Sequence, residues 1–388
     1  MRKVVFLLDQ PFDARNFERF GIEQWRRRGW SIEVWDLTPL VHADVWRSFL
    51  QSGRTARCFE GYHQITSADD LRRRLAADGR VDYYVDIAGD TLNGIRAKLH
   101  LAWTGAVRIV LAVGSLPVAG SEVKEGRLRR AWKAFQGGPS RVASAMYGRA
   151  VAWLAPPGLV VVSGTNSLRM MARWANREIV KAHNLDYDLY LQFCAEGQGA
   201  DAGAVFLDQD FCFHPDYAYD SIPAWATPDR YFATTRSGLE TIARALNCHA
   251  RVAAHPRSTY ERDHGDVFGQ IPIDRGQTAA LIRDCSVVVC HSSAAIQLAV
   301  LFEKPVIFVT TDELAASPGG PSIEKFASEL GKRVINLDAD LSNIDWRSEL
   351  TIDRERYDAY RRRHVKLDES PDRLLWEIIM DHIDRRAS

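Results

Sequence analysis

The chain has 388 residues and carries 50 Lys and Arg residues against 50 Asp and Glu residues, so its formal net charge is zero. This length accommodates two ordinary α/β domains, and the charge balance gives no global basic field for nucleic acid. Six cysteines without a CxxC pair or metal-ligand spacing favour a reduced, cytosolic compartment. No stretch approaches the roughly 18 uncharged apolar residues of a transmembrane helix.

The first half of the chain alternates expected strands and helices. Short β-branched runs predict strands over residues 4–8, 31–37, 81–87, 107–113 and 158–163. Helical periodicity predicts helices over residues 15–29, 68–77 and 91–101, the first ending at Gly29 and the second capped by Ser67. This alternation is typical of parallel βαβ units with right-handed crossovers.

Residues 122–154 interrupt the alternation, because they are strongly basic and carry interleaved aromatic side chains. After Glu122 their only acid is Glu125, against Lys124, Arg127, Arg129, Arg130, Lys133, Arg141 and Arg149. Such a segment can lie on an anionic membrane surface, or it can be a partly buried helical pair with a solvated basic face. Peripheral contact with the inner face of a membrane is therefore one expectation.

A second α/β pattern follows the Gly-rich stretch 196–203, which is typical of an interdomain linker. We expect strands over residues 204–207, 287–290, 306–310 and 333–337, a helix over 228–246, and a last helix over 372–385 capped by Ser370. The predicted fold is α/β, with two doubly wound, Rossmann-like domains facing each other across a cleft. The first spans residues 1–198 and the second 199–370, and helix 371–388 packs back on the first domain.

Polar clusters end two expected strands of the second domain, His255-Pro256-Arg257-Ser258 and His291-Ser292-Ser293. Ligands of open α/β sheets bind beyond the carboxyl ends of the strands, so we expect His255, Arg257, His291 and both serines to face one crevice. A helix beginning at Ser292 or Ser293 would offer free backbone N–H groups to a phosphate, and Arg257 would add a fork of donors. The alternative is plain helix capping and a strand-end histidine bonded to the backbone.

Several acids are candidates for a catalytic base, and spacing does not choose among them. Asp208 and Asp210 follow the strand 204–207, and as residues i and i+2 of an extended segment they point the same way. Further acids and histidines lie near expected strand ends or late in the first domain, namely Asp9, Asp13, Asp86, Asp90, His183, Asp186, Asp188 and His214. Each of these also has an ordinary structural interpretation.

The run from His255 to Thr310 resembles the donor-binding half of glycosyltransferases with two Rossmann domains, the GT-B type. Its His-Pro and Ser-Ser motifs are similar to those of bacterial sialyltransferases and Kdo transferases, in which they bind the phosphate of a CMP-sugar. Stretches around Asp186, Asp208 and Trp376 resemble bacterial capsule and lipopolysaccharide biosynthesis proteins. The acid-acid-Gly motif of the CMP-sialate transferases is not matched, because Asp69-Asp70 is followed by Leu71.

The resemblance implies a cytosolic, metal-independent glycosyltransferase, either hexosyl or sialyl/Kdo type, with no cofactor. It would move a sugar from a nucleotide-sugar donor to a glycan or lipid-linked acceptor in surface polysaccharide synthesis. His255, Arg257, Ser258, His291, Ser292 and Ser293 would bind the donor, and Asp208, Asp186 or Asp188 would act in catalysis. Two rivals remain open, namely a sugar-nucleotide 2-epimerase of the same architecture and a non-catalytic scaffold in a polysaccharide assembly complex.

Overall fold

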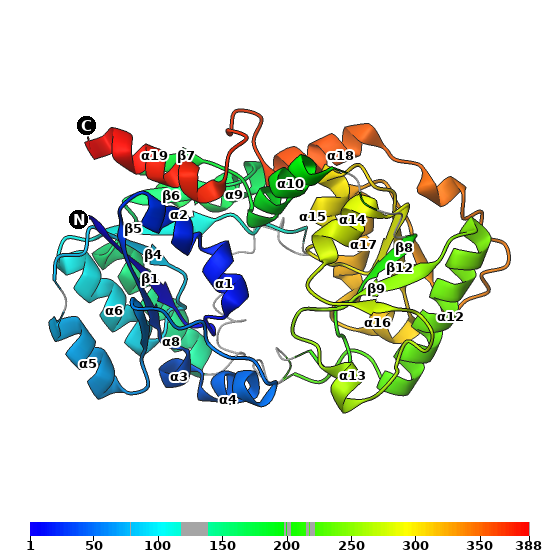
Figure 1. Ribbon diagram of the computed structural model, residues 1–388, viewed down its shortest axis with the longest axis horizontal. Coiled ribbons are helices and arrows are strands. Elements are labelled where there is room, and N and C mark those ends of the chain that lie inside the picture. The colour runs from blue at the N-terminus through cyan, green and yellow to red at the C-terminus, as the bar shows by residue number, and fades with distance from the viewer. Residues whose placement is uncertain are drawn as a thin grey trace.

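The computed structural model describes residues 1–77, 79–117, 139–197, 199, 203–214, 217 and 222–387 of the chain. Within these residues the strands form two separate parallel sheets, one of seven strands and one of six (Figure 1). The sheet orders are β3-β2-β1-β4-β5-β6-β7 and β10-β9-β8-β11-β12-β13. Both orders reverse beside their first strand, as in a doubly wound sheet, so the predicted pair of Rossmann-like domains is confirmed.

The first sheet is made of short, largely buried strands, and β1 lies in its middle between β2 and β4. These strands are Lys3–Leu8 (β1), Ser31–Asp36 (β2), Tyr62–Gln64 (β3), Tyr83–Asp86 (β4), Val107–Ala112 (β5), Leu159–Val162 (β6) and Glu178–Lys181 (β7). The helices between them include Ala14–Arg19 (α1), Ile22–Arg27 (α2), Thr38–Val41 (α3), Ala43–Gln51 (α4), Ala68–Ala77 (α5), Leu92–Trp103 (α6), Pro139–Leu154 (α8) and Thr165–Met170 (α9).

The second sheet is built in the same way, with β8 between β9 and β11. Its strands are Ala204–Leu207 (β8), Ala250–Ala253 (β9), Ile273–Asp274 (β10), Val287–Cys290 (β11), Val306–Thr310 (β12) and Val334–Asn336 (β13). Its helices include Pro228–Leu246 (α12), Tyr260–Asp263 (α13), Thr278–Asp284 (α14), Ile296–Leu301 (α15), Asp312–Ala316 (α16) and Gly320–Glu329 (α17).

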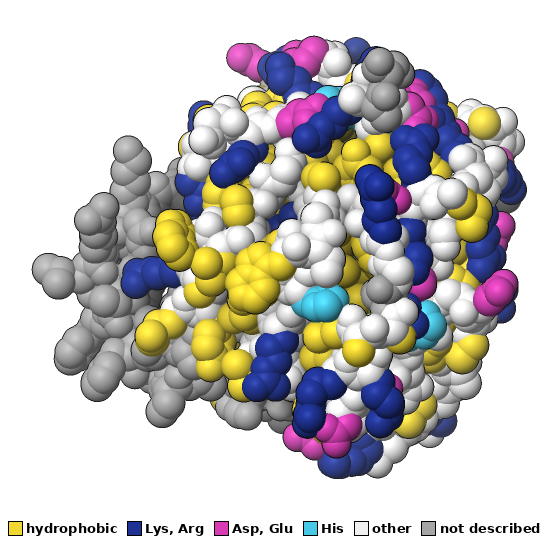
Figure 2. All heavy atoms as spheres, turned by 90° about the vertical axis from the view of Figure 1, so that its left-hand side faces the viewer, with side chains coloured by type: hydrophobic (Ala, Val, Ile, Leu, Met, Phe, Trp, Pro, Cys, Tyr) yellow, Lys and Arg dark blue, Asp and Glu magenta, His cyan; other side chains and the backbone are white. Residues whose placement is uncertain are grey.

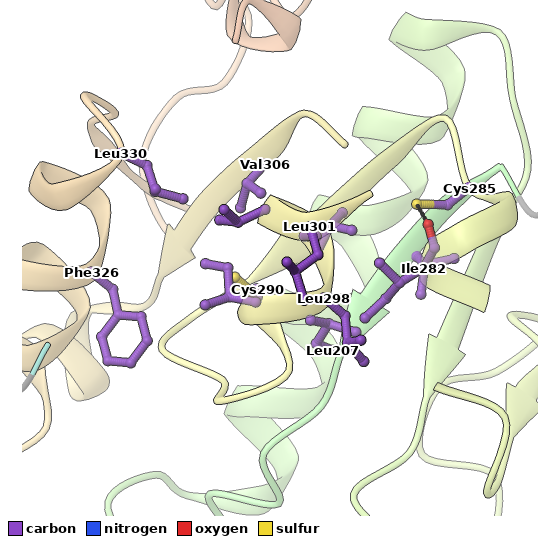
Figure 3. Packing of buried hydrophobic residues seen from close by; sticks show 14 of the residues in the cluster. Leu207, Ile282, Cys285, Cys290, Leu298, Leu301, Val306, Phe326 and Leu330 are labelled. Carbon is purple, nitrogen blue, oxygen red and sulfur yellow. Dashed lines mark hydrogen bonds between the residues drawn. The ribbon is translucent and has the colours of Figure 1, made fainter. Parts of the chain in front are cut away.

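The core on one face of the second sheet lies between β8, β11 and β12 and the helices α14, α15 and α17 (Figure 3). Leu207, Cys290 and Val306 come from the strands, and Ile282 and Leu298 come from the helices. All four residues of both β8 and β11 are buried, which explains why these strands are uniformly apolar instead of alternating.

The chain passes between the two halves through Leu185–Glu196 (α10) and returns through Arg354–Tyr360 (α18), the π-helix Arg361–Val365 (η3) and Leu375–Ala387 (α19). The ring centroids of Tyr190 on α10 and Phe302 beside α15 lie 5.1 Å apart. On the other side, Trp376 of α19 is fully buried against Phe6 and Trp25 and donates a hydrogen bond to the carbonyl of Arg19 (2.8 Å). The C-terminal helix therefore packs on the first sheet.

The helix expected over residues 91–101 spans Leu92–Trp103, and two other predicted helices differ more in the structure. The helix expected over residues 15–29 is broken into α1 and α2 by Gly21, whose φ of 60° lies in the left-handed region. A Cβ there would lie 2.4 Å from the Trp376 ring, so Gly21 makes room for α19. The last helix begins at Leu375 instead of residue 372, because the carboxylate of Asp188, not Ser370, accepts the backbone N–H of Leu375 (2.8 Å). Among the described residues no helix is long and apolar enough to cross a membrane.

Candidate functional site

The switch point of the second sheet lies between β8 and β11, and Gln209 bridges the two strand ends. Its Oε1 accepts the backbone N–H of Ser292 (2.7 Å), and its Nε2 donates to the Ser292 hydroxyl (3.4 Å). Gln209, Ser292 and Ser293 are all partly exposed. Open α/β sheets bind their ligands at such a point, so this bridge marks the centre of the candidate site.

The prediction that a helix begins at Ser292 or Ser293 is wrong, because α15 begins at Ile296. The N–H of Ser292 is not free for a phosphate, since it already donates to Gln209. The Ser293 hydroxyl accepts the N–H of Ala295 (3.3 Å) and so holds the turn before the helix. At the end of β11 the two serines therefore place their hydroxyl groups, and not the N-terminus of a helix.

A cluster of one arginine and two histidines lies at the end of β9, the neighbouring strand. An Arg257 Nη2 lies 3.3 Å from Nε2 of His214, and the rings of His214 and His255 have centroids 4.8 Å apart. Ser258 is buried, donates to the carbonyl of His255 (2.9 Å) and accepts from Arg275 (3.1 Å). His255 and Arg257 are thus brought together as predicted, and Ser258 supports the loop that carries them.

Asp208 and Asp210 form a buried acid pair beneath this cluster. The predicted extended segment is wrong, because Asp210 has a φ of 55° and its N–H donates back to Oδ1 of Asp208 (3.1 Å). Oδ2 of Asp208 and Oδ1 of Asp210 are buried without a hydrogen-bond partner among the described residues. Burial raises the pKa of Asp208 to about 6. Burial and then the nearby Asp208 raise the pKa of Asp210 to about 8.

The expectation that His291 faces the crevice is wrong. Its side chain is fully buried, with Nδ1 2.7 Å from the carbonyl of Val309 and Nε2 3.1 Å from the Tyr231 hydroxyl. Burial lowers its pKa to about 4. His291 is therefore a neutral core histidine that fastens the end of β11, and no nitrogen of its ring is left for a phosphate.

Asp186 and Asp188 lie in the first turn of α10, and no hydrogen bond or ion pair joins them to Asp208 within the described residues. Asp188 caps α19 through Leu375, and burial raises its pKa to about 7. Asp186 faces the positive charges of Arg19 and Arg15 on α1, and burial raises its pKa. His183 is buried between two backbone carbonyls, and burial lowers its pKa.

A second polar centre lies at the switch point of the first sheet, between β1 and β4. Oδ2 of Asp9 accepts the N–H of Gly89 (2.7 Å) and lies 3.3 Å from Nε2 of His42. A Cβ at residue 89 would lie 2.8 Å from the same oxygen, so glycine leaves room for the carboxylate. The other acids of this edge have structural partners. Asp13 caps α1 and pairs with Arg54, Asp86 pairs with Lys98 and Arg108, and Asp90 pairs with Lys98.

Sequence reasoning missed His42, Tyr260 and Arg275. Arg275 follows β10, a strand of only two residues that gives no periodic signal. Its guanidinium lies over the ring of Tyr260 and contacts the carbonyl of His255 (3.3 Å).

Pro215, Asp216 and most of the basic segment 122–154 lie outside the described residues. The part of the chain that the structure describes contains no group of three metal-ligating side chains.

Comparison with known proteins finds no matching family model and no matching curated protein. Solved structures do match, among them the glycotransferase of kitacinnamycin, with 13% identity over 99% of both chains and a TM-score of 0.53. The wall teichoic acid polymerase TagF matches with 11% identity over 100% of this chain and 90% of its own, with a TM-score of 0.52. UDP-GlcNAc 2-epimerase from Methanocaldococcus jannaschii matches with 11% identity over 99% and 100%, with a TM-score of 0.51. The fold is therefore the GT-B type that the sequence predicted.

Proposed function

We propose that the protein is a metal-independent glycosyltransferase. It moves a sugar from a nucleotide-sugar donor to a glycan or lipid-linked acceptor in surface polysaccharide synthesis at the inner face of a membrane. The observation that carries the proposal is that His255 and Arg257 follow β9, and Ser292 and Ser293 follow β11, the two strands that flank β8, so both groups lie at the same edge of the second sheet. Among the predicted donor-binding residues, Ser258 then acts by supporting His255, and His291 by holding β11.

In the proposed reaction the bond between the anomeric carbon and the nucleotide phosphate breaks, and negative charge grows on the departing phosphate. Arg257 offers a planar fork of N–H donors, and His255 lies beside it at the end of β9. Stabilisation of the charge that develops in the transition state is a large term in group transfer. These side chains supply it without a metal ion.

The acceptor hydroxyl must lose its proton as its oxygen bonds to the anomeric carbon. Asp9 and His42 suit this step by their geometry, because the Asp9 carboxylate lies 3.3 Å from Nε2 of His42 and can orient that imidazole as a general base. They lie at the switch point of the first sheet, which is the proposed acceptor side. Asp208, Asp186 and Asp188 were the acids expected from sequence, and of these Asp208 is nearest to the donor cluster, beside Asp210 and the loop of His255.

The proposed donor class rests on the resemblance of the motifs. His255-Pro256 and Ser292-Ser293 favour a CMP-sugar of the sialic acid or Kdo type, and a hexosyl donor is the alternative. The capsule or lipopolysaccharide role and a membrane contact through residues 122–154 belong to the same proposal.

A specific observation also favours the 2-epimerase alternative. Two acids with raised pKa values, Asp208 and Asp210, lie beneath the donor cluster, and an epimerase needs acids around the sugar. It would act on its sugar nucleotide without any acceptor.

Product analysis separates the two reactions. The protein is incubated with CMP-, UDP- and GDP-sugars, with and without a membrane-lipid extract, and products are followed by NMR and mass spectrometry. The transferase proposal predicts sugar transfer that requires the extract. It predicts a loss of at least about 100-fold in Asp9→Asn and in His42→Ala with donor binding unchanged.

His63→Ala is the matched control, because this histidine faces Glu33 at the edge of the first sheet, at 3.8 Å. It should keep normal transfer. Conversion of a UDP-sugar without the extract would instead establish the epimerase.

A further inference from the structure

Helices α6 and α8 pack side by side on the first domain. Their contact is apolar and is formed by Ile95, Leu99 and Ala102 of α6 with Tyr147, Val151 and Ala155 at the end of α8. The α8 residues in this contact are spaced by four, which is one stripe of a helix. The inward face of α8 is therefore covered by α6.

The outward face of α8 from residue 146 onward also carries large apolar side chains, and nothing in the described part of the chain covers them. Met146 is 63% exposed and Trp153 is 81% exposed, seven residues further along the same face. Trp103, the last residue of α6, is 70% exposed. Large exposed aromatic groups lose the free energy that burial would give, so their gathering on two neighbouring helices marks a contact surface.

The charged residues of the two helices have one sign, and the carboxylate of Asp90, which lies against Gly148 of α8, is paired with Lys98. Neither α6 nor α8 contains an Asp or a Glu, although the whole chain has equal numbers of acidic and basic residues. Arg96 of α6 and Arg149 of α8 are both exposed. Arg149 lies on the turns between Met146 and Trp153, so cationic and apolar side chains share the outward face of α8.

The space-filling view of the first half shows hydrophobic side chains gathered on one face, with Lys and Arg side chains around them (Figure 2). Tryptophan prefers the boundary between lipid and water, because its ring is apolar and its N–H is polar. Arginine binds the phosphate of an acidic headgroup. A second protein surface would have to supply acids to Arg96 and Arg149, whereas an anionic bilayer supplies both phosphate and an apolar layer.

We propose that the outer surface of α6 and α8, formed by Trp103, Met146, Trp153, Arg96 and Arg149, docks on an anionic lipid bilayer. The inference rests on the proposed function, and it specifies which part of the protein contacts the membrane. Docking depends on these side chains alone and needs neither donor nor sugar transfer.

The test is co-sedimentation of the full chain with vesicles of phosphatidylcholine, with and without phosphatidylglycerol. Wild type should pellet with the anionic vesicles only and be released by high salt. Trp103→Ser combined with Trp153→Ser should weaken binding by about tenfold or more, and Arg149→Gln by a smaller factor. Unchanged melting temperatures would show that these variants fold, because both tryptophans are exposed.

Met170→Ser is the matched control, since Met170 of α9 is 64% exposed outside this surface, and it should bind like wild type. His255→Ala should also keep vesicle binding while losing the donor, which separates docking from the proposed reaction. Absence of wild-type binding, or equal binding by the double tryptophan variant, would overturn the proposal. So would a concentration-dependent dimer that the same variant abolishes, because the surface would then bind a second copy.

Discussion

Replacement of Asp210 by Asn tests the buried acid pair. Asp210 is 2% exposed, and its pKa is raised to about 8 by burial and by the neighbouring Asp208. In the unfolded chain an aspartate titrates near about 3.9. Between these two values the folded protein holds a proton that the unfolded chain has lost, so raising the pH favours unfolding.

The magnitude follows from about 1.4 kcal/mol for each pH unit. Between pH 5 and pH 8, Asp210 should lower the free energy of unfolding by about 4 kcal/mol. Asparagine has nearly the same shape, tolerates the left-handed backbone at φ 55°, and does not ionise. Asp210→Asn should therefore remove this loss, so its stability relative to wild type should grow steadily from pH 5 to pH 8.

The assay is urea unfolding of wild type and variant at several pH values. Asp340→Asn is the flat control, because the N–H of Ser342 lowers the pKa of this exposed acid, so residue 340 is ionised in both the folded and the unfolded chain from pH 5 to pH 8 and the variant's difference from wild type should not change with pH. A difference between wild type and Asp210→Asn that does not change from pH 5 to pH 8 would refute the reasoning.

Three further outcomes are expected. Trp376→Ala should lower the free energy of unfolding by about 3 to 5 kcal/mol, because the Trp376 ring is fully buried. Trp153→Ala should change this free energy little, because Trp153 is exposed. Equal effects of the two variants in denaturant titrations would contradict the prediction. Gly21→Ala should lower the free energy of unfolding by more than about 1 kcal/mol, because the φ of residue 21 is 60° and the new Cβ would meet the Trp376 ring. A variant with the melting temperature of wild type would contradict this prediction. NMR should find His291 neutral at pH 5.5, about 1.5 units above its lowered pKa of about 4; titration near about 6.5 would show an accessible ring.

The fold could be predicted from sequence because its strands are short, apolar and regularly separated by helices. The strand Ala204–Leu207 and the helices Ala68–Ala77 and Pro228–Leu246 have the predicted boundaries. The short strands β3, β7 and β10 were missed because they lie at the edges of the sheets and contain polar residues, so they lack the continuous apolar run of central strands such as β8. The break at Gly21 was missed because it depends on Trp376, which is more than 350 residues away in the chain.

The site could be predicted only in part, for a similar reason. His255 and Arg257 were located by their place after a strand, which is a local signal. Whether a side chain faces outward depends on partners from other strands, and the sequence does not show them. His291 looked like its neighbours Ser292 and Ser293 but turns inward to Val309 and Tyr231. His42 meets Asp9 only because β1 and the turn before α4 converge in the folded chain.

The most direct test of a donor site at the switch point of the second sheet is a thermal-shift panel with CMP, UDP, GDP and dTDP. One nucleotide at about 100 times its dissociation constant should stabilise wild type by roughly 2.7 kcal/mol. The shift should vanish in Arg257→Ala and persist in Arg244→Ala, an exposed arginine on α12 outside the site. A shift that survives Arg257→Ala, or no shift with any nucleotide, would contradict the account.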